Sequence, residues 1–409
     1  MINKKHLFIK LVSGSAISQL IVIATTPLLT RMYTLNEFGY LAIVNAFLMV
    51  LGVVGSLRYD QLIFKYTSKH EWYRCFNNGL VSSIVIFILL LFFFISCFFV
   101  GILHYYLLII PFLVFVFSLT QLYSSLLSVF GWYTTLSYGL ITRSAVMIIT
   151  QYFLQVYLGG FALILGVFLG QLAHLIILSF IFNRKHNMGI IDFNVNFYDL
   201  KDSIYSTSQS LSNSFSSQIP SIFIPYGFGM TMMGIYGLAQ RLTFLPITFF
   251  SNAIRPFILG ELNNNRDDKE KVSKFLEKGS IALLVLGSIG VLLINIFSEE
   301  FFVFYAGEKW RAAGDVASAL SFWVMCAFAN IIATSYLTVR AHFKELFIYD
   351  LVLLFTRVLI TFYSYVSELG FIEFIYLYSF IGLIFNFFII IYAISLGKKD
   401  AENIVGNNT

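Results

Sequence analysis

Twelve apolar stretches, each long enough to cross a bilayer, constrain the fold of this 409-residue chain more than any other feature. A membrane-spanning helix needs roughly 20 mostly apolar residues, because its backbone must form all of its hydrogen bonds internally. With 58% hydrophobic and 11% charged residues, the chain cannot cover a soluble particle of this size with polar groups. The sequence therefore predicts an all-α integral membrane protein with about twelve transmembrane helices. The stretches lie at about 9–29, 38–57, 79–101, 105–129, 137–158, 161–182, 204–226, 233–257, 279–298, 313–337, 346–366 and 371–396.

The distribution of basic residues predicts the orientation in the membrane. The termini and the loops on their side hold 21 Lys and Arg residues, with Arg143 counted in the loop at 130–143, whereas the opposite loops hold three. Cytoplasmic loops of membrane proteins carry such an excess. We therefore expect a multi-pass membrane protein with both termini in the cytoplasm.

The longest loop, at 183–203, separates six stretches from six. It predicts an N-terminal six-helix bundle over residues 1–190 and a C-terminal one over 191–409. The halves are weakly similar: "SGSAISQLIVIATTP" precedes "EFGYLAIVNAF" in the first, and "STSQSLSNSFSSQIP" precedes "MMGIYGLAQRL" in the second. Repeats that start on the same side of the membrane would be parallel.

Motifs of enzymes are missing from the sequence. It contains no P-loop, no HExxH and no Gly-rich nucleotide fingerprint, and its six histidines do not cluster. The three cysteines show no metal-ligand spacing. We expect no enzyme, no catalytic residues, no metal and no cofactor.

Polar side chains inside the stretches are the first candidates for a functional site. At 100° per residue, the seventh stretch gathers amides and hydroxyls opposite an apolar stripe that includes Leu211 and Phe215, and the first stretch has a similar polar face. Such faces meet either a water-filled cavity or another helix. Both alternatives stay open, and the candidates for lining a cavity are Gln19, Gln209, Asn213 and Ser216.

Charged residues inside the stretches are the second group of candidates. Arg241 and Arg357 lie within stretches, where an arginine normally faces an interior or a cavity. They serve either a structural ion pair or a cationic lumen that binds an anionic substrate, since the guanidinium group can bond two phosphate oxygens at once. Asp350 precedes Arg357 by seven residues, about 10 Å along a helix, which is too far for a direct pair. Gly166 and Gly170 form a GxxxG pattern that is typical of a close helix contact.

Two motifs near the N-terminus resemble those of a known family. "PLLTRMYTLNEFGYLAIV" at 27–44 and "SLRYDQLI" at 56–63 are similar to the N-terminal signature of bacterial O-antigen and polysaccharide flippases of the Wzx type. These belong to the multidrug/oligosaccharidyl-lipid/polysaccharide exporter superfamily. Asp60 stands where the family usually has glutamate, which keeps the charge. The segment "AGEKWRAAGDVASAL" at 306–320 resembles the family's outer loop before its tenth helix.

The resemblance implies a flippase that moves undecaprenyl-pyrophosphate-linked oligosaccharide, an O-antigen or capsule repeat unit, from the cytoplasmic to the periplasmic leaflet of the bacterial inner membrane. It implies two six-helix bundles around a central cavity and alternating access driven by an ion gradient. Arg31 and Arg58 match arginines of the family's motifs. With Arg241 and Arg357 they form the expected substrate site, and Asp60 and Asp350 are the candidates for ion coupling.

The same resemblance sets the expected partners and the competing functions. The partners are the lipid-linked oligosaccharide, membrane lipids, a polysaccharide polymerase and a chain-length regulator, and no nucleic acid is expected. A drug exporter of the same superfamily is the main alternative, although its cavity would favour acidic residues. An oligosaccharide polymerase is a further alternative that the absence of a large outer loop opposes.

Overall fold

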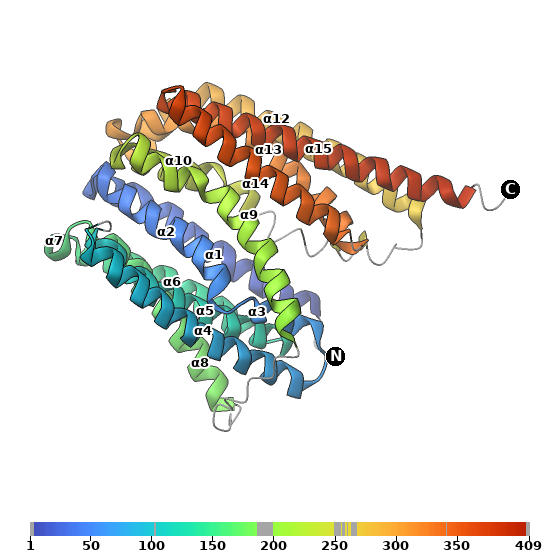
Figure 1. The fold of residues 1–409 in the computed structure, drawn as a ribbon, viewed down its shortest axis with the longest axis horizontal. Helices are drawn as coiled ribbons and strands as arrows, with labels where there is room; N and C mark the ends of the chain where they lie inside the picture. The colour runs from blue at the N-terminus through green and yellow to red at the C-terminus, as the bar shows by residue number, and fades with distance from the viewer. Residues whose placement is uncertain are drawn as a thin grey trace. The chain divides into compact units, whose positions relative to one another are not determined.

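The computed structural model describes residues 4–101, 104–185, 199–248, 255, 258–259, 261–262, 268–340 and 342–405, and every regular element in these ranges is helical. Figure 1 shows the helices in chain order. Within this part of the chain, nine helices are long and apolar enough to cross a membrane. The predicted all-α, multi-pass membrane fold is thereby confirmed.

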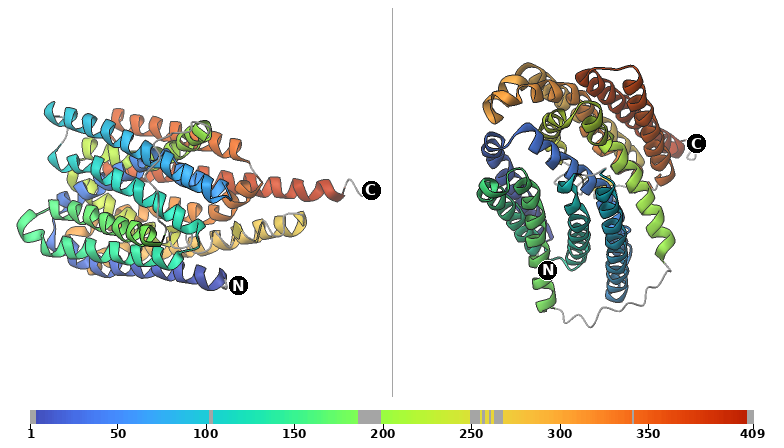
Figure 2. Two further views of the ribbon diagram at one scale, coloured as in Figure 1. Left: turned by 90° about the horizontal axis from the view of Figure 1, so that it is seen from below. Right: turned by 60° about the vertical axis from the view of Figure 1, so that its left-hand side comes forward.

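The first compact unit is built from six long helices and several short ones. Helix α6 packs between α1 and α8, and α5 packs against α2, α4 and α8. Figures 1 and 2 show these helices side by side. The elements are α1 (Lys4–Met32), α2 (Leu35–Gly55), α3 (Tyr59–Leu62), η1 (Ile63–Lys65), α4 (Lys69–Phe99), η2 (Tyr105–Ile109), α5 (Ile110–Val129), α6 (Tyr133–Phe153), α7 (Gln155–Leu158) and α8 (Phe161–Lys185).

The second compact unit is organised around α13, which packs against α10, α12 and α15 and is buried along most of its length. Helix α14 packs mainly on α15. The elements are α10 (Met230–Thr243), α12 (Lys269–Ala306), η4 (Glu308–Trp310), α13 (Ala312–Val339), α14 (Phe343–Val366) and α15 (Phe371–Val405).

Three of the twelve predicted spans fall outside the nine apolar helices. Helices α6 and α9 (Leu200–Gly227) are long but polar, and α10 has only 14 residues. Helix α6 packs between two apolar spans, so hydroxyl and amide groups on it can be satisfied by its neighbours. One expectation needs correction: the basic-residue count placed Arg143 in a loop, but it is the eleventh of the 21 residues of α6.

Helix α9 belongs to both units. The contacts divide the chain into residues 1–222 and 223–409, so most of α9 groups with the N-terminal unit and its last turn with the C-terminal one. Pro220 and Pro225 lie on either side of this division and each removes a backbone hydrogen bond, which makes bending easier there. The boundary predicted at 190/191 lies in 186–198, outside the described residues.

Glycines allow α6 and α8 to approach closely. A Cβ atom on Gly170 would lie 2.6 Å from the carbonyl oxygen of Arg143, and one on Gly166 would lie 2.5 Å from Cγ of Gln151. Neither position can hold a larger residue without moving the facing helix. The GxxxG pattern at 166–170 is therefore confirmed as a close helix contact.

We expect Gly170→Ala to lower the thermal unfolding temperature of the purified protein, because the new methyl group would meet a backbone atom that cannot rotate away. Overpacking of this kind costs roughly 1–3 kcal/mol. Gly290→Ala in α12 is the matched control, since nothing lies within 4 Å of its Cβ position. The unfolding temperature of the control should be unchanged or slightly higher, because alanine favours a helix more than glycine does. Equal effects of the two substitutions would show that the α6–α8 contact is looser than described.

Candidate functional site

The "SLRYD" segment forms a tight turn at the end of α2. Leu57 and Arg58 adopt left-handed backbone conformations, with φ of 45° and 57°. Non-glycine residues rarely adopt this conformation, so the surrounding contacts must enforce it. Tyr59 is 1% exposed in a cluster of apolar side chains from α4, α5, α6 and α8. The buried tyrosine therefore anchors the turn.

The charged residues of this turn contact the turn itself and α9. Asp60 is 6% exposed and accepts a hydrogen bond from Ser56 Oγ at 2.7 Å, and its other oxygen lies 3.9 Å from Nη1 of Arg58. Arg58 donates from Nε to Ser210 Oγ on α9 at 3.1 Å. Ser203, also on α9, donates to the carbonyl oxygen of Leu57 at 2.5 Å. Arg58 and Asp60 thus lie at the end of a span, and Arg58 also attaches it to α9.

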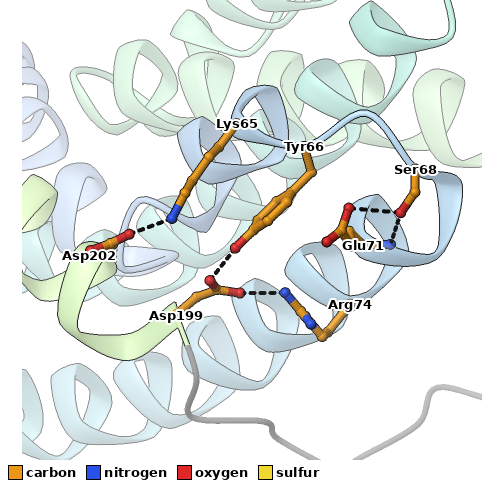
Figure 3. Close-up of polar contacts among 7 residues, drawn as sticks. All are labelled: Lys65, Tyr66, Ser68, Glu71, Arg74, Asp199 and Asp202. Carbon is orange, nitrogen blue, oxygen red and sulfur yellow. Dashed lines mark hydrogen bonds and ion pairs between the residues drawn. The ribbon is translucent and has the colours of Figure 1, made fainter.

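A cluster of four charged residues and one tyrosine reinforces this attachment, and we call it the α9 clasp: Lys65, Tyr66, Arg74, Asp199 and Asp202. Figure 3 shows that Asp199 accepts hydrogen bonds from Tyr66 and Arg74, and that Lys65 contacts Asp202. Asp199 is 2% exposed, and its bond to Nη2 of Arg74 measures 2.9 Å. This carboxylate is therefore a buried acceptor at the start of α9.

The outer part of the clasp is weaker. Lys65 and Asp202 are 2.6 Å apart, but each side chain is about half exposed, so water screens the pair. Burial, together with the hydrogen bond to Asp199, raises the pKa of Tyr66 to about 12, and the phenol keeps its proton at neutral pH. The hydrogen bond to Asp202 raises the pKa of Lys65.

The sequence reasoning missed Asp199. The signal was present, because acidic residues stabilise the first turn of a helix, and Asp199 directly precedes α9. Its partners Tyr66 and Arg74, however, are more than 120 residues away in the chain. Only the fold brings them together.

The remaining predicted arginines occupy different surroundings. Arg31 is exposed in the last turn of α1, and Arg241 is partly buried in the last turn of α10. Arg357 in α14 is 2% exposed, and its guanidinium lies 4.5 Å from the ring centroids of both Trp323 and Tyr378. Two aromatic faces therefore cover the guanidinium group of Arg357.

The predicted cavity-lining and ion-coupling residues differ in exposure. Asn213 is exposed and Gln19 and Gln209 are partly exposed, whereas Ser216 is 2% exposed. On the opposite, apolar face of the same helix, Phe215 is 39% exposed, so the exposed fraction of the side chains does not distinguish the polar face of α9 from the apolar one. Asp350 is 8% exposed in α14. No group of three or more His, Cys, Asp or Glu side chains able to hold a metal ion gathers in the ranges that the structure describes.

Solved structures with the same fold cover nearly the whole chain. An inward-facing multidrug resistance transporter of the MATE family within the MOP superfamily has a TM-score of 0.70 at 11% identity, covering 100% of this chain and 97% of that one. The lipid II flippase MurJ in an inward closed conformation has a TM-score of 0.70 at 13% identity, covering 98% and 93%. A MOP superfamily transporter from Pyrococcus furiosus has a TM-score of 0.66 at 12% identity, covering 98% and 95%.

The chain therefore has the fold of these solved structures, and the proteins that share it are transporters and a flippase rather than enzymes. The sequence model for "polysaccharide biosynthesis protein" matches residues 28–313, which is more than half of the chain. The protein belongs to this family. A comparison with the curated proteins gives no match.

Proposed function

We propose that this protein is a flippase that carries undecaprenyl-pyrophosphate-linked oligosaccharide, the repeat unit of O-antigen or capsule, from the cytoplasmic to the periplasmic leaflet of the bacterial inner membrane. The observation that carries the proposal is the family match at 28–313 on a fold shared, over nearly the whole chain, with a lipid II flippase. The excess of basic residues in alternate loops supports cytoplasmic termini. A polysaccharide polymerase and a chain-length regulator are the protein partners that this function implies.

The charges within the helices favour an anionic substrate over the cationic drugs of an exporter. Arg31, Arg58 and Arg241 are the proposed contacts of the pyrophosphate, each partly or fully accessible. Asp60 accepts a hydrogen bond from Ser56 and lies 3.9 Å from Arg58, so its negative charge is partly balanced by an arginine. Transport would use alternating access coupled to an ion gradient, and we assign the coupling to Asp60 and Asp350.

The experiment is complementation of a bacterial strain that lacks its own flippase but makes the matching lipid-linked repeat unit. The wild-type protein should restore surface polysaccharide, measured by gel electrophoresis of cell extracts, and should leave drug resistance unchanged. Increased drug resistance without polysaccharide would support the exporter instead.

Within this assay, we expect Arg31→Ala to reduce surface polysaccharide at least about tenfold, because a charge-assisted contact to phosphate contributes roughly 1.5–3 kcal/mol. Arg31→Lys should retain part of the export, since lysine keeps the charge but not the two-pronged geometry. Arg311→Ala is the matched control: this exposed arginine pairs with Glu299 and Glu308. It should export normally. Normal export by Arg31→Ala, at equal protein level, would remove Arg31 from the substrate site.

A further inference from the structure

The middle of α6 holds a cation that the charge count had assigned to a loop. Arg143 lies about 120–140° around the helix from Tyr138 and Ile149, which are 62% and 56% exposed on its apolar outer face. It therefore points toward the neighbouring helices and is partly buried there. Among the described residues it forms no ion pair with a carboxylate. A mid-membrane arginine without an acidic partner is costly and calls for another source of negative charge.

His174, the fourteenth of the 25 residues of α8, lies beside this arginine. Its ring packs on Gly139 of α6, where a Cβ atom would lie 2.4 Å from Cδ2 of the imidazole. Gly139 is one helical turn before Arg143, and the guanidinium and imidazole groups are electrostatic neighbours. His174 is 5% exposed, and neither ring nitrogen has a hydrogen-bond partner within the described parts of the chain. Buried polar groups are rarely left in this state.

The hydroxyl groups nearby on α6 are already engaged. Ser144 is hydrogen-bonded to Ser18 of α1 at 2.6 Å, and Ser137 donates to the carbonyl oxygen of Tyr133 at 3.0 Å. The pair of Arg143 and His174 thus offers N–H donors and a positive charge, and the described chain supplies no carboxylate to them. A tetrahedral oxyanion meets both needs, because guanidinium bonds two phosphate oxygens and imidazole can donate to a third.

We propose that Arg143 and His174 form a binding site for a phosphate-class anion at mid-depth in the N-terminal unit, and that its occupant is the diphosphate of the lipid-linked substrate. The assignment to a lipid rests on the proposed function, whereas the anion site itself follows from the two side chains. A free inorganic anion has the same chemistry, so the experiment separates these two sources.

The binding test uses purified protein in detergent with three probes: farnesyl diphosphate, inorganic pyrophosphate and uncharged farnesol. Wild type should bind farnesyl diphosphate more tightly than pyrophosphate and should not bind farnesol. Arg143→Gln should weaken binding of farnesyl diphosphate by roughly tenfold to a hundredfold. His174→Leu should weaken it severalfold, and the exposed Arg311→Gln should not. Unchanged affinity in Arg143→Gln overturns the site, and equal affinity of wild type for both diphosphates overturns the assignment to a lipid.

The thermal unfolding temperature without ligand separates this site from a structural role of Arg143. Removing a buried cation that has no carboxylate partner among the described residues should raise the unfolding temperature of Arg143→Gln, whereas removing a structural contact should lower it. A lowered temperature with unchanged binding overturns the proposal. Two results separate the site from the proposed function. Wild type that binds farnesyl diphosphate but does not restore polysaccharide contradicts the proposed function only. Export by Arg143→Gln at the wild-type rate contradicts the site only.

Discussion

Replacing Asp199 by alanine is expected to detach the start of α9 and to abolish export. Asp199 is 2% exposed and accepts hydrogen bonds from Tyr66 and Arg74. Removing one partner of a buried pair costs roughly 3–5 kcal/mol, and since Arg74 retains 23% side-chain exposure we expect the lower end of this range. No described helix packs closely along the backbone of α9, so the attachment of α9 to the rest of the unit depends mainly on these side-chain contacts. The effect should appear as a lower thermal unfolding temperature and as faster proteolysis near the start of α9.

Asp202→Ala is the matched control for this prediction. Asp202 lies three residues further along and pairs with Lys65, but both side chains are about half exposed, and exposed pairs contribute about 0–1 kcal/mol. Asp199→Asn should give an intermediate result, because the amide oxygen can still accept one of the two hydrogen bonds. Equal unfolding temperatures for Asp199→Ala and Asp202→Ala would show that burial of Asp199 does not matter.

Replacing Arg357 by alanine is expected to destabilise the C-terminal unit and to lower the amount of protein in the membrane. The guanidinium group lies 4.5 Å from the ring centroids of both Trp323 and Tyr378 at 2% exposure. A desolvated cation–π contact contributes about 2 kcal/mol or more, and this side chain makes two. Arg357→Lys should recover part of the stability, because lysine keeps the charge but cannot stack a planar group between two rings. Protein level and unfolding temperature are the measurements.

Val358→Ala is the control, since this neighbouring side chain is 44% exposed and its truncation should change stability by no more than about 0.5 kcal/mol. The sequence alone left two roles open for Arg357, a structural one and a contact with substrate. The aromatic contacts on both faces favour the structural role. A normal level of folded Arg357→Ala protein together with loss of export would reverse this conclusion and return Arg357 to the substrate site.

Most of the helical architecture could be predicted from the sequence. The apolar stretches at 279–298 and 313–337, for example, correspond to α12 and α13, because a bilayer admits little besides helices of this length. Prediction was less accurate for α6, which is polar. The helix was expected to begin at residue 137 but begins at Tyr133, and Arg143, which the charge count placed in a loop, lies in the middle of the helix. Hydropathy locates apolar helices well and polar ones poorly.

The candidate site could be predicted only in part. Arg58 and Asp60 were found because their motif is compact, with both charges two positions apart after an apolar span. Their contact with Ser210 of α9 was not predictable, since no local pattern links positions 152 residues apart. The same reason explains why Asp199 and its partners Tyr66 and Arg74 were missed.

The sequence by itself determined that this chain is a multi-pass membrane protein with about twelve helices and that it belongs to a family of polysaccharide biosynthesis proteins, because hydropathy and short motifs are local properties. Only the tertiary structure decided which buried charges have partners. It stacked Arg357 between two aromatic rings, placed two hydrogen bonds on Asp199, and left Arg143 and His174 as neighbours with no carboxylate paired to Arg143 among the described residues. The energy of a buried charge depends on which groups surround it in space, and those groups come from distant parts of the chain.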